Sequence, residues 1–137
     1  MCFGLGLKIK IYSKHLDSIK NEYKNYESVD LISLIQESDI VSFHCKPSHD
    51  NKPLINFEML KSMKKNALII NTARGNLIDE KDLKTALEEG IIKGAAFDVF
   101  SSEPATESVL FNVPNLILTP HIAASTVEAQ IVVATNC

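Results

Sequence analysis

The sequence has no tryptophan, no internal repeat and no low-complexity segment, and no apolar run approaches the roughly 20 residues that a membrane-spanning helix needs. Basic residues are not in excess, because 14 Lys and Arg face 17 Asp and Glu for a net charge of −3. We therefore expect no nucleic-acid or membrane partner. The opening residues MCFGLGLKIKIY become charged too soon for a secretory signal peptide, and we expect none.

Cysteine is also scarce. Cys2, Cys45 and Cys137 are odd in number and share no metal-ligand spacing. This usage predicts reduced thiols, no metal site and a cytoplasmic location. The 137 residues, 45% of them hydrophobic, are enough for one domain with a single core.

What the chain does contain is a regular alternation of two patterns. Short β-rich runs are separated by segments of helical period; the runs are KIKIY, DIVSFH, ALIIN, GAAFD and LILTP. Because these runs are almost wholly apolar, both faces of the sheet are expected to be covered. Strand-helix-strand repetition of this kind predicts an α/β fold with a doubly wound parallel sheet.

Helix starts are indicated by small polar residues that precede apolar positions at helical spacing. Ser28 is expected to cap a first helix, Asn56 a second and Asp79 a third. Gly90 is a natural stop for the third. The expected inward positions are Leu31, Ile32, Leu34 and Ile35 in the first helix, Phe57, Leu60 and Met63 in the second, and Leu83, Ala86 and Leu87 in the third.

Polar side chains follow the apolar runs, where ligands bind in open parallel sheets. Arg74 in NTARG carries a permanent planar cation suited to a carboxylate. His121 in LTPHIAAS can exchange a proton near neutral pH. Glu103 in VFSSEP can accept the other N–H of the imidazole, orienting the ring and favouring its charged form.

Each of these three residues has a simpler interpretation when taken singly. A histidine after a strand is more often structural, a loop arginine is usually solvated, and a glutamate before proline is usually a loop residue. Three complementary groups at successive strand ends instead predict a site for a 2-keto or 2-hydroxy acid. The hydride that such chemistry needs must come from a nicotinamide cofactor, since side chains cannot supply one.

Two stretches, NTARGNLIDEKDLKTALEEGIIKGAAFDVFSSEP and LILTPHIAASTVEAQ, resemble the D-isomer-specific 2-hydroxyacid dehydrogenases, most closely the D-3-phosphoglycerate dehydrogenase branch. The resemblance implies a Rossmann-like dinucleotide-binding domain, with Arg74 as the substrate-binding arginine, His121 as the catalytic acid/base and Glu103 as its paired carboxylate. It also implies that a set of residues lines the dinucleotide: Ser13, Cys45, Thr72, Ala73, Arg74, Asp98, His121, Ala123 and Ala124.

The implied activity is NAD-dependent oxidation of a D-2-hydroxy acid, with 3-phosphoglycerate, and hence serine biosynthesis, as the leading candidate. Reduction of glyoxylate or hydroxypyruvate is the enzymatic alternative. An NADH-sensing protein resembling the related corepressors is a second alternative, although the Trp-containing segment expected after the histidine is absent. An inactive gene remnant is a third. The family is commonly dimeric, so a homodimer of the full-length protein is expected.

The chain departs from the family pattern in what it contains. The first strand, the Gly-rich phosphate turn and the substrate-binding domain are not found in residues 1–137, so we interpret the chain as a partial dinucleotide-binding domain and expect it to be inactive alone. GLGLK contains two glycines but precedes a strand, as the end of a helix would.

Two further departures concern single residues. Ser13 stands where an acidic residue usually holds the ribose diol, which makes NADP possible beside NAD. Lys46 replaces the usual proline after Cys45, so the geometry of that loop is not specified by the resemblance.

Overall fold

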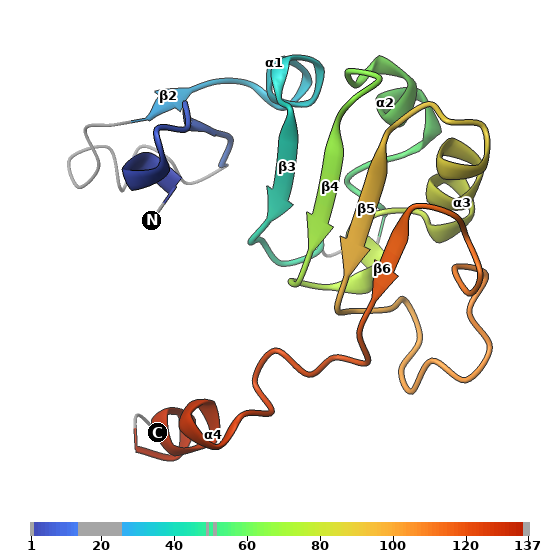
Figure 1. The fold of residues 1–137 in the computed structure, drawn as a ribbon. Coiled ribbons are helices and arrows are strands. Elements are labelled where there is room, and N and C mark those ends of the chain that lie inside the picture. The colour runs from blue at the N-terminus through green and yellow to red at the C-terminus, as the bar shows by residue number, and fades with distance from the viewer. Residues whose placement is uncertain (1, 14–25, 49, 51, 136–137) are drawn as a thin grey trace.

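The computed structural model describes residues 2–13, 26–48, 50 and 52–135. Its main sheet has four parallel strands, in the order β3 (Ile40–Phe43), β4 (Leu68–Asn71), β5 (Gly94–Phe97) and β6 (Leu116–Leu118) (Figure 1). The register pairs Ile40 with Leu68 and Leu68 with Gly94. All four strands therefore point the same way, and the predicted parallel α/β fold is confirmed.

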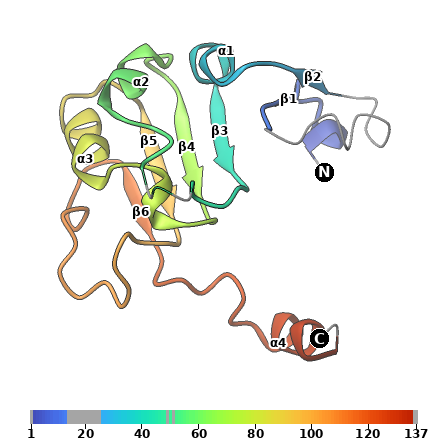
Figure 2. The same cartoon turned by 180° about the vertical axis from the view of Figure 1, so that it is seen from behind.

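Helices cover one face of this sheet. Figures 1 and 2 show α2 (Phe57–Ser62) and α3 (Glu80–Glu88) on the same side of the strands, with α1 (Leu31–Glu37) beside α2. Their apolar faces supply Ile35, Leu60 and Leu83 to the core, each with no exposed surface. This burial, rather than helix propensity, stabilises such short helices.

The expectation that both faces of the sheet are covered is wrong for β3 and β6 among the described residues. Ile40 is 49% exposed and Ser42 is exposed, whereas Val41 and Phe43 between them are buried. Ile117 in β6 is 69% exposed. This alternation is typical of a strand with one open face; only β5, with its small residues, is closed on both sides.

Two of the three predicted helix caps are confirmed. Asn56 Oδ1 accepts a hydrogen bond from the Met59 amide at 3.1 Å, and Asp79 Oδ1 accepts from the Lys81 and Asp82 amides. The prediction for Ser28 is wrong. Asp30 caps α1 instead by accepting from the Ser33 amide at 2.9 Å.

Ser28 belongs to a second, two-stranded parallel sheet, β1 (Lys10–Ile11) with β2 (Glu27–Ser28). A 3₁₀ helix, Cys2–Leu5, and Gly6 at φ +74° lead into β1, as expected for GLGLK. The Lys10 ammonium contacts Glu37 at the end of α1 and so ties this pair of strands to the main body. No described strand pairs with the outer edge of β3.

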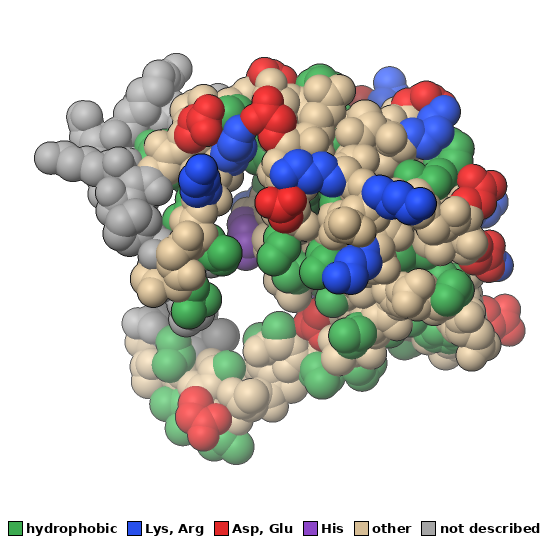
Figure 3. Space-filling model, turned by 45° about the horizontal axis from the view of Figure 1, so that its top comes forward, with side chains coloured by type: hydrophobic (Ala, Val, Ile, Leu, Met, Phe, Trp, Pro, Cys, Tyr) green, Lys and Arg blue, Asp and Glu red, His purple; other side chains and the backbone are tan. Residues whose placement is uncertain are grey.

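The C-terminal helix α4 (Val127–Thr135) lies away from the sheet (Figure 1). Its Val127, Ile131 and Val132 are 56–73% exposed. Figure 3 shows hydrophobic side chains gathered on this part of the chain, whereas basic and acidic side chains are interspersed over the face of the main body that it presents. None of the described helices is both long and apolar enough to span a membrane.

Candidate functional site

The three groups singled out in the sequence follow three neighbouring strands. Arg74 comes after β4, Glu103 after β5 and His121 after β6. Because the strands are parallel and hydrogen-bonded in this order, their carboxyl ends share one edge, the lower edge in Figure 1. The structure therefore brings these residues to the same rim, as the sequence predicts.

His121 and Glu103 are in direct contact. His121 Nδ1 lies 2.6 Å from Glu103 Oε2, while Glu103 Oε1 accepts a hydrogen bond from the Phe100 amide at 2.9 Å. The Phe100 amide and His121 lower the pKa of Glu103 against the opposing effect of burial, and the charge of Arg74 adds to the decrease. Glu103 is thus a carboxylate at neutral pH, bound to Nδ1 and leaving Nε2 on the far side of the ring.

The backbone of His121 is held in an uncommon conformation. Its φ is +55°, in the left-handed region that residues other than glycine rarely adopt. The His121 amide donates to the Thr119 carbonyl at 3.0 Å. On either side of His121, the Thr119 hydroxyl and the Ile122 amide donate to Asp98 Oδ1, and the Ala123 amide donates to Asp98 Oδ2 at 3.0 Å. Asp98 therefore fixes the segment that presents the imidazole.

Asp98 is 5% exposed, and burial alone would raise its pKa. The hydrogen bonds from Thr119, Ile122 and Ala123 outweigh burial, so the pKa of Asp98 is lowered below its ordinary value of 3.8. Because the pKa of Asp98 is lower in the folded state, its ionised carboxylate stabilises the fold. This stabilisation is complete above pH 3.8 and is lost as the pH falls further.

We expect Asp98→Asn to lower the free energy of unfolding by about 2 kcal/mol at neutral pH, since an amide cannot accept all three bonds. The difference from the unsubstituted chain should shrink below pH 3.8, where Asp98 becomes protonated first in the unfolded chain and at lower pH in the folded one. Urea denaturation at a series of pH values measures both effects. A difference that stays constant from pH 7 to pH 3 would contradict this assignment.

A buried asparagine shapes the loop that carries Arg74. Asn71, with no exposed surface, donates from Nδ2 to the Arg74 carbonyl at 2.9 Å and accepts at Oδ1 from the Ala73 amide at 3.1 Å. The Arg74 side chain itself is exposed, and its Nη1 donates to the Ala73 carbonyl at 2.6 Å. The two hydrogen bonds of Asn71 therefore fix the backbone at Arg74, and the guanidinium remains accessible at the rim.

The remaining residues predicted to line a dinucleotide lie at strand ends. Cys45 and Thr72 are exposed beyond β3 and β4, Ala73 is half-buried, and Ala123 and Ala124 are exposed after His121. Ser13 is half-buried two residues beyond β1, on the separate two-stranded sheet. Small, accessible side chains along a strand-end rim fit an elongated ligand. The described residues contain no cluster of His, Cys, Asp and Glu that could hold a metal ion.

A cavity of about 360 Å³ lies beside the His121–Glu103 pair. Its other walls are largely apolar and come from Phe100, Pro104, Ala105, Phe111, Leu118, Thr119 and Pro120. The pair thus borders a largely apolar hollow, while the side chains of His121 and Glu103 remain 46% and 36% exposed.

Sequence reasoning missed several residues that hold this site together, namely Asn71 as a loop former, Gly75 and Glu80. Gly75, directly after Arg74, is packed so closely that a Cβ there would lie 1.9 Å from the Phe100 carbonyl carbon. A glycine directly after the candidate arginine was the available signal for such a close backbone approach.

Comparison with known proteins places this geometry in a family. The profile described as "D-isomer specific 2-hydroxyacid dehydrogenase, NAD binding domain" matches residues 1–123. The chain belongs to this family. Its resemblance to the D-2-hydroxyacid dehydrogenases, inferred above from two sequence stretches, is thereby confirmed.

Relatives within the family carry the names of different enzymes. The chain is 42% identical over 133 residues to a D-3-phosphoglycerate dehydrogenase from Synechocystis sp., covering 97% of this chain and 24% of that protein. It is 41% identical over 127 residues to a glyoxylate reductase from Thermococcus litoralis, covering 93% and 38%. An acyclic imino acid reductase solved with NADPH and D-Arg superposes with a TM-score of 0.82 at 31% identity, covering 94% and 40%. The chain thus spans less than half of each of these proteins.

Proposed function

We propose that this chain forms the cofactor-facing rim and the acid–base pair of an NAD-dependent D-2-hydroxyacid dehydrogenase that oxidises 3-phosphoglycerate. The observation that carries the proposal is the 2.6 Å contact between His121 Nδ1 and Glu103 Oε2, at the edge where Arg74 also lies. A homodimer of the full-length protein and a cytoplasmic location belong to the same proposal.

Each residue has a role that its surroundings allow. Arg74, exposed at the rim, binds the substrate carboxylate and the C2 oxygen. His121 takes the C2 hydroxyl proton at Nε2, because Nδ1 is engaged by Glu103. Glu103, held ionised by the Phe100 amide, stabilises the positive charge that the ring then acquires.

The cofactor that fits is a nicotinamide dinucleotide, which accepts the C2 hydride when bound. Thr72, Ala73, Ala123 and Ala124 would lie along it, and their small side chains leave room at the rim. Ser13 brings no negative charge against a 2′-phosphate, so we propose that NADP is tolerated beside NAD. The imino acid reductase of similar fold was solved with NADPH.

Glyoxylate or hydroxypyruvate reduction is the second candidate. It is favoured by the 41% identity to the Thermococcus litoralis glyoxylate reductase, which nearly equals the 42% identity to the phosphoglycerate dehydrogenase. The proposal for 3-phosphoglycerate depends instead on EPAT and HIAASTVEAQ, the stretches around Glu103 and His121.

The test transfers the segment into both relatives. The 133 matched residues of the Synechocystis enzyme and the 127 of the Thermococcus enzyme are replaced by this chain's residues, and each host keeps the rest of its own sequence. We expect both chimeras to transfer hydride between their host's substrate and NAD, with binding of NADP also measurable. The host that retains the larger fraction of its kcat identifies the better-matched substrate.

Two folded chimeras without hydride transfer would contradict the proposed function and favour the inactive remnant. A larger retained kcat in the glyoxylate reductase host would replace phosphoglycerate by the second candidate. A large preference for NAD over NADP in both hosts would end the proposal for NADP.

A further inference from the structure

The loop of residues 100–108 carries Glu103 but contains no helix or strand, so its position depends on contacts to other elements. Two of these contacts come from the segment after Arg74. The missing side chain of Gly75 lets the Phe100–Ser101 backbone pack against it. Glu80, in the first turn of α3, then reaches the same backbone with its carboxylate.

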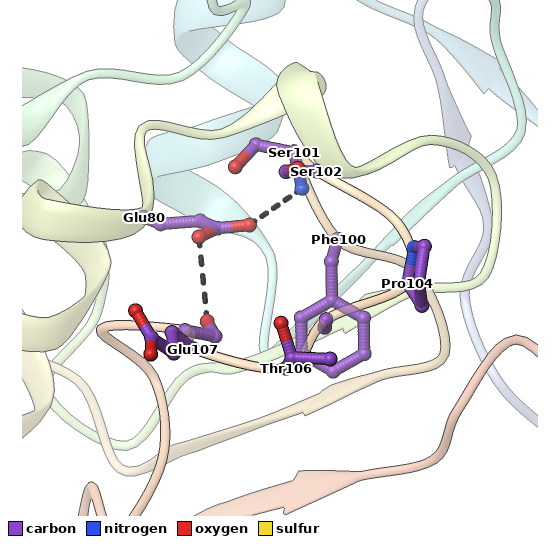
Figure 4. Close-up of a pocket in the computed structure, with 9 residues that line it drawn as sticks. Glu80, Phe100, Ser101, Ser102, Pro104, Thr106 and Glu107 are labelled. Atoms are coloured by element: carbon purple, nitrogen blue, oxygen red, sulfur yellow. Dashed lines mark hydrogen bonds between the residues drawn. The ribbon is translucent and has the colours of Figure 1, made fainter.

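Glu80 spans a cavity of about 260 Å³ between α3 and this loop (Figure 4). Its Oε1 accepts a hydrogen bond from the Ser101 amide at 2.6 Å (Figure 4). Its Oε2 lies 3.5 Å from the Ser108 hydroxyl. One carboxylate therefore reaches the loop on both sides of Glu103, with a short bond to Ser101 and a long, weak contact to Ser108.

Two consecutive amides donate to two different carboxylates. The Phe100 amide donates to Glu103 and the Ser101 amide to Glu80. The Ser101 N–H belongs to the Phe100–Ser101 peptide, and the Phe100 N–H to the peptide before it, so only the two backbone dihedral angles of Phe100 separate the two bonds. Holding the Ser101 N–H therefore restrains the neighbouring peptide that meets Glu103. A charged acceptor makes this restraint stronger than a neutral one.

From this arrangement we infer that Glu80 is a positioning residue, which holds the loop so that Glu103 meets His121, a role that rests on the function proposed above. Glu80 touches neither His121 nor Arg74 among the contacts described, so it acts through the loop, chiefly at Ser101 and more weakly at Ser108. The length of the side chain, rather than its charge at the start of α3, is what this role requires.

Two substitutions of Glu80 separate the effect of side-chain length from the effect of its charge. Glu80→Asp keeps the negative charge that favours a helix N-terminus but withdraws the carboxylate by about 1.5 Å. Glu80→Gln removes the charge but keeps an oxygen at the same reach. Glu107→Gln is the matched control, because Glu107 lines the same cavity and makes no side-chain hydrogen bond among the described residues.

Amide hydrogen exchange of Phe100 and Ser101 is measured in the 137-residue chain, and kcat in the phosphoglycerate dehydrogenase chimera. For Glu80→Asp we expect about tenfold or faster exchange at these amides and a kcat about tenfold to a hundredfold lower. Glu80→Gln keeps an acceptor at the same reach but a weaker, neutral one, so it should change both measurements less than Glu80→Asp does. Glu107→Gln should leave both unchanged.

The opposite order would overturn the inference: Glu80→Asp behaving as the parent, or Glu80→Gln impaired as much as Glu80→Asp. An inactive parent chimera would count against the proposed function, while the exchange rates would still decide whether Glu80 holds the loop. Loss of kcat without faster exchange in Glu80→Asp would also count against a positioning role.

Discussion

Replacing His121 with asparagine in the phosphoglycerate dehydrogenase chimera is expected to lower kcat about a thousandfold, within the range that one general acid–base group contributes. Asparagine tolerates the left-handed backbone that His121 adopts at φ +55°. The loss therefore reports the missing proton transfer and not backbone strain. Steady-state rates of NADH formation with 3-phosphoglycerate measure it.

His44→Gln is the matched control for this substitution. His44 is also an exposed histidine beyond a strand end, after β3, but its Nε2 lies 2.9 Å from the Ser42 hydroxyl and not beside a carboxylate. Its replacement should leave kcat near that of the parent chimera. A His121→Asn variant that retains most of the parent rate would contradict the proposed role of the imidazole.

Gly75→Ala is expected to destabilise the chain more than an alanine substitution at any of the other glycines. The new Cβ would lie 1.9 Å from the Phe100 carbonyl carbon, 2.1 Å from its oxygen and 2.4 Å from the Ser101 nitrogen. All three atoms belong to the backbone and cannot rotate away. We expect the free energy of unfolding to fall by about 3 kcal/mol or more, as measured by urea denaturation.

The control for Gly75→Ala is Gly4→Ala, because nothing lies within 4 Å of a Cβ at Gly4. That substitution should change the free energy of unfolding by no more than about 0.5 kcal/mol. A Gly75→Ala chain as stable as the parent would show that the Phe100–Ser101 backbone does not pack against Gly75 as described. The same result would weaken the inference about Glu80, which depends on that packing.

Elements whose cause is local could be predicted from the sequence. Asn56 and Asp79 precede apolar residues at helical spacing, and each caps its helix because its acceptor lies within three residues of the amides it binds. The four strands of the main sheet were visible as apolar runs for the same reason. Ser28 was misassigned because Asp30, two residues later, offers a carboxylate closer to the start of α1.

Contacts between distant segments could not be predicted in the same way. Glu80 meets Ser101 across 21 residues, and Asp98 meets Ile122 across 24, with no periodic pattern that reports either contact. The strand-end rule did predict that Arg74, Glu103 and His121 share a rim, since it requires only that the strands be parallel. It did not predict that Asp98 is buried beneath the His121 segment with both carboxylate oxygens engaged.

The interdependence of Glu103 and His121 is tested most directly by a double-mutant cycle of Glu103→Gln and His121→Asn, measured as kcat in the phosphoglycerate dehydrogenase chimera. If the carboxylate acts only by orienting the ring and stabilising its charge, the double variant will be no slower than His121→Asn alone. Losses that multiply, so that the double variant is slower by the product of the single effects, would show that the two residues act independently and would contradict the acid–base pair.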